Sequence, residues 1–137
     1  MILPARKPEV FTATLTDMGN APFYFTERYK DMSMSILNGR YASQLLGLNP
    51  RKILDLGAGC GAFAVWCYKM WPYAWVYCEE RDEFHHDLCQ KNLGPGGRMV
   101  QHWAEGKDYD IVRFGVGMRG ATVPKAKLYL NDNVSTY

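Results

Sequence analysis

Three glycines within five residues separate an apolar run from a segment of helix-forming residues. The stretch runs Ile53-Leu54-Asp55-Leu56-Gly57-Ala58-Gly59-Cys60-Gly61-Ala62-Phe63. This order predicts a strand, a tight turn and a helix. Because glycine has no Cβ, the backbone can turn sharply and a bound molecule can lie directly against the peptide groups. The first N–H groups of the following helix are unpaired and suit a polar or anionic ligand.

A second strand signal follows at the distance of one βαβ step. Trp75-Val76-Tyr77-Cys78 is apolar and β-prone, and it ends in Glu79-Glu80. In nucleotide-binding α/β folds the acid that ends the second strand accepts hydrogen bonds from both ribose hydroxyls, because a carboxylate matches a vicinal diol. Neighbouring residues on a strand point to opposite faces, so the strand register decides between Glu79 and Glu80.

The glycine stretch resembles motif I of the class I S-adenosylmethionine (SAM) dependent methyltransferases. That motif reads apolar strand, Asp or Glu, x, Gly, x, Gly, x, Gly, and Asp55, Gly57, Gly59 and Gly61 fill its fixed positions. The resemblance implies SAM as the cofactor and gives Asp55 a role near its cationic methionine end. The cofactor-binding residues that it implies are Asp55, Gly57, Ala58, Gly59, Gly61 and Glu80.

The choice of Glu80 over Glu79 follows from a narrower resemblance. The run from Glu80-Arg81-Asp82-Glu83 to Gln90-Lys91-Asn92-Leu93 resembles the FkbM-like methyltransferases when Glu80 is the anchor. The alternative interpretation of the glycine stretch is the dinucleotide-binding fingerprint G-x-G-x-x-G. That fingerprint has glycine, or sometimes alanine, at the position of Ala62. Asp55 argues against this alternative, because a carboxylate would be an odd neighbour for pyrophosphate.

Length and composition limit the function classes. With 137 residues the chain is one domain's worth but short for a seven-stranded methyltransferase sheet. We divide it into an N-terminal arm, residues 1–25, and a minimal SAM-binding domain, residues 26–137. A net charge of +2 argues for neither nucleic acid nor an anionic membrane. No apolar stretch approaches a membrane span and the start is broken by prolines, so a cytoplasmic protein is the default expectation.

Metal ligands and a catalytic base are not apparent in the sequence. The spacings of Cys60, Cys67, Cys78 and Cys89 match no zinc pattern, so we expect small apolar core residues and no metal. His85-His86 would point about 100° apart on a helix, which favours a solvated helix face. The catalytic residue stays unassigned, and the nearest candidates are Asp110, Glu105, His102 and Tyr24.

The remaining segments complete an α/β pattern. We expect an irregular arm before residue 26, a helical region over 26–46 that Gly39 divides, a helix over 62–70 and another capped by Asp82. After residue 97 two alignments compete: Tyr109-Asp110-Ile111-Val112 is a fourth strand, or the end forms a third strand and a hairpin. The predicted fold is a Rossmann-like three-layer sandwich with a truncated, mostly parallel sheet and an added C-terminal hairpin.

The function that this reading predicts is methyl transfer from SAM to a small-molecule acceptor, with an oxygen nucleophile favoured. The alternative is a SAM-binding regulatory or partner protein without methyl transfer. A parallel sheet truncated after three or four strands leaves an open edge, so we expect a homodimer that completes the sheet or the site.

Overall fold

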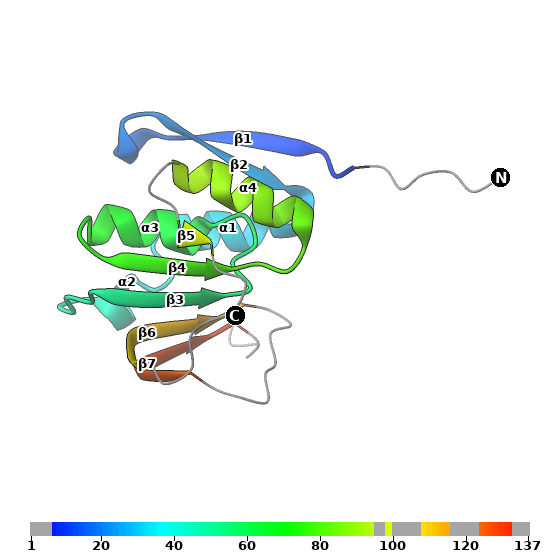
Figure 1. Cartoon of the computed structure of the whole chain (residues 1–137). Helices are drawn as coiled ribbons and strands as arrows, with labels where there is room; N and C mark the ends of the chain where they lie inside the picture. Colours follow the sequence, from blue (N-terminus) through cyan, green and yellow to red (C-terminus); the bar gives the residue numbers. More distant parts are fainter. Residues whose placement is uncertain (1–6, 95–97, 100–107, 116–123, 133–137) are drawn as a thin grey trace.

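The computed structural model describes residues 7–94, 98–99, 108–115 and 124–132, and its centre is a parallel sheet (Figure 1). The five strands lie in the order β5-β4-β3-β6-β7. Every neighbouring pair is parallel, which confirms the predicted α/β Rossmann-like class. The strands are β3 (Lys52–Leu56), β4 (Trp75–Glu79), β5 (Arg98–Met99), β6 (Asp108–Phe114) and β7 (Lys125–Asn131).

Helices form at 62–70 and after Asp82 as predicted, whereas the helical region expected over 26–46 starts later, because Thr26 ends a strand and the first α-helix begins at Lys30. They are α1 (Lys30–Leu37), α2 (Ala42–Leu45), α3 (Ala62–Met70) and α4 (Glu83–Leu93), with two 3-10 turns, η1 (Thr16–Met18) and η2 (Glu27–Tyr29). Asp82 caps α4, because its side chain accepts a hydrogen bond from the His85 N–H at 3.1 Å. Gly39, with φ of +95°, separates α1 from α2 as predicted.

The N-terminal arm is not irregular. Strands β1 (Val10–Leu15) and β2 (Ala21–Thr26) form an antiparallel hairpin that lies over α4 on the side away from the sheet (Figure 1). Gly19 and Asn20 have left-handed φ of +67° and +60°, which suits a tight hairpin turn. The arm therefore adds a third layer outside the helices.

The expected C-terminal hairpin is wrong. Strands β6 and β7 pair in parallel, with Ile111 opposite Leu128, and β6 lies beside β3, as the fourth-strand alignment requires. The sequence alternates over 126–130 as a strand does, but alternation carries no information on strand direction. The only hairpin among the described residues is the N-terminal one.

The two faces of the sheet have separate cores. Ile53, Val76 and Ile111 are at most 1% exposed and pack in one cluster with α3. Leu54 and Val112, which alternate with them, belong to a second cluster on the opposite face. Helices α1, α3 and α4 lie on the first face (Figure 1). No helix in the described part of the chain is long and apolar enough to cross a membrane.

Candidate functional site

The glycine turn, Gly57–Gly61, follows β3 at the carboxyl edge of the sheet. Gly57, Gly59 and Gly61 have φ of +73°, +60° and +90°, a region that side chains rarely adopt. The N–H groups of Gly57 and Ala58 donate to the Glu79 carbonyl oxygen at 2.9 and 3.0 Å. These bonds join the turn to the end of β4, so the carboxyl ends of β3 and β4 are held side by side.

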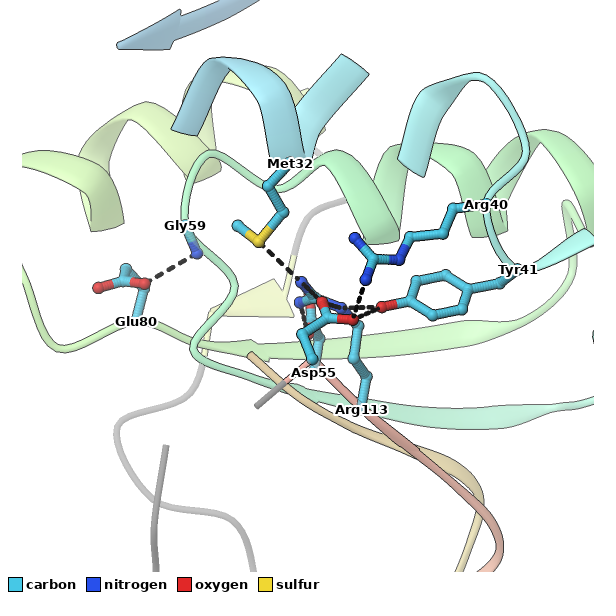
Figure 2. A network of polar contacts seen from close by, with 8 residues as sticks. Met32, Arg40, Tyr41, Asp55, Gly59, Glu80 and Arg113 are labelled. Atoms are coloured by element: carbon cyan, nitrogen blue, oxygen red, sulfur yellow. Dashed lines mark hydrogen bonds and ion pairs between the residues drawn. The ribbon is translucent and has the colours of Figure 1, made fainter. Parts of the chain in front are cut away.

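Glu80, not Glu79, brings its carboxylate to the glycine turn (Figure 2). Glu80 Oε1 accepts the Gly59 N–H at 2.8 Å, and Oε2 accepts the Asp82 N–H at 2.9 Å. The Glu79 side chain is buried and pairs with Arg81, 3.2 Å from Oε1 to Nε. A half-buried carboxylate beside a glycine turn is the geometry expected for a residue that binds a ribose.

Asp55 lies inside the protein beneath the glycine turn. Its side chain is 0% exposed, and Oδ1 accepts a hydrogen bond from Arg113 Nη1 at 2.6 Å. Burial raises the pKa of Asp55, and the Arg113 guanidinium acts in the opposite direction. Oδ2 has no hydrogen-bond partner in the described structure. Asp55 thus keeps one buried acceptor atom unused.

Arg113 on β6 binds both Asp55 and Asp132, which directly follows β7. We call these three residues, together with Tyr41 and Arg40, the arginine cluster. Figure 2 labels Arg113, Asp55, Tyr41 and Arg40. Arg113 Nη2 and Nε donate to Asp132 Oδ2 at 2.6 and 3.1 Å. The Tyr41 hydroxyl donates to Asp132 Oδ1, and Arg40 Nη2 lies 3.5 Å from the same oxygen. Burial disfavours charge on Arg113, but Asp55 and Asp132 outweigh it and raise its pKa.

Sequence reasoning missed the arginine cluster. One signal was present: Arg113 stands two residues after Ile111 in an apolar strand run, so its side chain must point into the same core face. A buried arginine requires carboxylate partners. Asp55 and Asp132 meet that need, but the sequence does not show that they lie close together.

His85 was expected on a solvated face, and this is wrong. Its ring is buried, with Nδ1 2.5 Å from Asp82 Oδ2 and Nε2 2.8 Å from Thr26 Oγ1. The hairpin supplies Thr26, and its packing against α4 encloses the imidazole. The error follows from expecting an irregular arm, since nothing then covers this side of α4.

Of the four candidate catalytic residues the structure describes two, Asp110 and Tyr24. Tyr24 is connected to the glycine turn, because the Asn92 side chain bonds both the Tyr24 backbone and the Cys60 carbonyl oxygen. Asp110 lies near the other end of β3, where Oδ2 accepts the N–H groups of Arg51 and Lys52 at 2.7 and 3.0 Å. His102 and Glu105 lie outside the described residues. Within the described ranges, no group of three His, Cys, Asp or Glu side chains is placed to hold a metal, and the four cysteines are buried and free.

The solved structures that resemble this fold include several methyltransferases. Precorrin-6y C5,15-methyltransferase from Geobacter metallireducens aligns with a TM-score of 0.50 and 16% identity, over 67% of this chain and 52% of that one. Plantazolicin methyltransferase BpumL, solved with SAH, aligns at 0.47 and 17% over 64% and 36%. Glycopeptide N-methyltransferase MtfA, complexed with SAM, aligns at 0.47 and 20% over 61% and 40%.

These identities establish the fold alone. The chain has the α/β Rossmann-like fold found in methyltransferases, and it spans 36% of the BpumL chain and 52% of the precorrin enzyme. No protein-family model matches the sequence, and no curated protein matches it. A more particular assignment must come from the geometry of the site.

Proposed function

We propose that this chain binds SAM at the carboxyl edge of β3 and β4 and transfers its methyl group to a small-molecule acceptor, with an oxygen nucleophile favoured. SAM supplies a methyl group on a sulfonium, which leaves the protein to hold and align the two reactants. The resemblance of the run from Glu80 to Leu93 supports a methyltransferase of the FkbM-like group as part of this proposal. The proposed contacts come from Asp55, Gly57, Ala58, Gly59, Gly61 and Glu80.

The position of the Glu80 carboxylate carries this proposal. Its Oε1 is 2.8 Å from the nitrogen of buried Gly59, and Gly57 at the start of the same turn is half-buried. A carboxylate has about four acceptor positions, and two of those on Glu80 are used by backbone N–H groups. Glu80 can therefore still accept hydrogen bonds from a ribose diol.

Asp55 is the residue that we propose to bind the cationic methionine end of SAM. Its unpartnered Oδ2 is a buried acceptor that an ammonium group could satisfy. The carboxylates of Asp55 and Asp132 face two guanidiniums, those of fully buried Arg113 and of Arg40, so the formal charges of the arginine cluster balance. The feature that favours a cationic ligand group is therefore the unpartnered Oδ2 of Asp55 and not an excess of negative charge.

A second function, SAM binding without methyl transfer, is favoured by one observation. The ionisable side chains of Asp55, Glu80 and His85 are already hydrogen-bonded to protein groups in the described structure. A neutral oxygen nucleophile needs a base that can take its proton. Under this alternative the chain is a regulatory or partner protein.

The homodimer and the cytoplasmic location are further parts of the proposal. A second copy would complete the sheet beyond β7 or contribute to the acceptor side of the site. Sedimentation equilibrium would test the dimer, and a monomer at high micromolar concentration would contradict it.

Calorimetric titration with SAM, S-adenosylhomocysteine and NAD tests the cofactor. We expect micromolar binding of both adenosyl ligands and no binding of NAD. Formation of S-adenosylhomocysteine in the presence of hydroxyl-bearing acceptors would then separate the enzyme from the binding protein. Failure of the chain to bind either adenosyl ligand would refute both functions.

A further inference from the structure

One aromatic ring lies directly on the glycine turn. A Cβ built on Gly59 would lie 3.0 Å from Tyr29 Cδ1 and 3.1 Å from Cε1. The ring therefore covers the backbone of the turn's central glycine. Tyr29 is half-buried, the last residue of η2, and comes from the segment that leads from the hairpin into α1.

The neighbours of Tyr29 place it beside the proposed ribose position. Gly59, on which the ring lies, donates its N–H to Glu80. Burial, and next the Glu80 carboxylate, raise the pKa of Tyr29, so the phenol stays neutral. The ring is thus within reach of a group bound by both Gly59 and Glu80.

The Tyr29 ring packs against His85, whose own ring is held by two hydrogen bonds. The His85 ring meets Tyr29 edge-on, with 4.7 Å between centroids. His85 cannot rotate without breaking its contacts to Asp82 and Thr26, because each uses a different ring nitrogen. Arg28 adds a cation 5.2 Å from the centre of the Tyr29 ring. A ring supported in this way is a rigid wall.

We infer that Tyr29 is a cofactor-binding residue. Its ring, which packs on Gly59, forms one wall of the ribose subsite and contacts the adenosyl part of a ligand bound by Glu80. His85 is the positioning residue that holds this ring, through its bonds to Thr26 and Asp82. The inference rests on the proposed function and adds to it a subsite contact from the N-terminal half of the chain. The hairpin itself contacts α4 near both ends, through Thr26 at His85 and through Tyr24 at Asn92.

The test compares ring removal with hydroxyl removal. The variants are Tyr29→Ala, Tyr29→Phe and, as a matched control, Tyr68→Ala, which removes another half-buried tyrosine, near the end of α3. Calorimetry with S-adenosylhomocysteine and with 5′-methylthioadenosine, which lacks the amino acid end, reports on the adenosyl subsite. Thermal unfolding of each variant without ligand confirms that it is folded.

We expect Tyr29→Ala to weaken binding of both ligands about tenfold and by the same factor, because the lost contact is to their shared adenosyl part. Tyr29→Phe keeps the ring and should stay within about threefold of the wild-type affinity, and Tyr68→Ala should bind like wild type. Unchanged or tighter binding by folded Tyr29→Ala overturns the wall while leaving the cofactor site intact. Failure of wild type to bind either ligand would instead refute the proposed function.

Discussion

The glycine turn and the arginine cluster lie at the same edge of the sheet and are built in opposite ways. The turn and its acid come from one continuous βαβ unit, so Gly59 and Glu80 are only 21 residues apart. The cluster joins residues 58 and 91 positions apart, Arg113 with Asp55 and Tyr41 with Asp132. Local backbone chemistry specifies the first region, whereas the second forms only when all of its strands are assembled.

The two regions also use charge differently. Glu80 is half-buried and binds neutral backbone N–H groups, so solvent still reaches it. Arg113 and Asp55 are 0% exposed and depend on each other for compensation. We therefore expect changes in the cluster to act on stability and changes at Glu80 to act on ligand binding.

Arg113→Met should give the largest effect. It leaves the Asp55 and Asp132 carboxylates buried without their guanidinium, which costs about 3–5 kcal/mol in the free energy of unfolding. Chemical denaturation measures this loss. The matched control is Arg81→Met, whose side chain is 78% exposed and should cost less than about 1 kcal/mol. Equal losses in the two variants would show that burial of the pair is unimportant.

Gly61→Ala tests whether the turn is specified by close packing as well as by φ. A Cβ at Gly61 would lie 2.9 Å from Cys89 Sγ, so we expect a loss of about 2–4 kcal/mol. Gly47 has a similar φ of +82° but nothing within 4 Å of its Cβ position. Gly47→Ala should therefore cost only about 1 kcal/mol. If the two alanines cost the same, packing against α4 does not contribute.

Gly59→Val needs a different explanation from the one that motif I suggests. The motif predicts a side chain in the cofactor's space, but the Cβ would first meet the Tyr29 ring. The substitution also strains a residue at φ of +60°. Loss of SAM binding in this variant could therefore come from backbone strain or displacement of Tyr29 as well as from a blocked cofactor site. Substitution of Glu80 is a cleaner test of cofactor binding.

Glu80→Ala should weaken SAM binding by about 1–3 kcal/mol, because ribose hydroxyls would lose their acceptor. Glu79→Ala is the control, since its buried side chain faces Arg81 and not the turn. Calorimetry at a single salt concentration compares them. A larger loss of affinity in Glu79→Ala than in Glu80→Ala would contradict the strand register described above.

Asp110→Ala should have the smallest effect, about 1 kcal/mol in stability with no change in cofactor affinity. Hydrogen bonds from the Arg51 and Lys52 N–H groups are the leading reason that the pKa of Asp110 lies below 3.8, its ordinary value. An acid with a lowered pKa stabilises the fold above its unfolded-state pKa, and this contribution is lost as the pH falls through the folded-state value. The difference between wild type and variant should therefore shrink below about pH 3.8. A constant difference down to pH 2 would contradict this assignment.

Most of the βαβ unit could be predicted because its signals are local. The bounds of α3 match the predicted 62–70, and Asp82 caps α4 as its residue type suggests. The direction of β7 could not be predicted, because a strand pattern is the same in both directions. The N-terminal hairpin could not be predicted because a proline such as Pro22 usually interrupts a strand. Pro22 lies on β2, which is an edge strand, where proline is tolerated.

The residues of the candidate site also differ in how far the sequence predicts them. The glycine turn follows from a short motif with a mechanism, so the sequence predicts it directly. The residues alone leave Glu79 and Glu80 open, and only the resemblance to the FkbM-like methyltransferases favours Glu80. The ion pair of Asp55 and the support of Tyr29 by His85 depend on contacts between separate elements. Such contacts have no sequence signal until the topology is known.

The most direct test of the cofactor site is a backbone amide titration by NMR with S-adenosylhomocysteine. We predict that the largest shifts fall on Gly57, Gly59 and Asp82, whose N–H groups line or adjoin the glycine turn. The N–H groups of Arg51 and Lys52 at the opposite end of β3 should not move. Shifts centred on that opposite end, or none at saturating ligand, would contradict a cofactor site at the glycine turn.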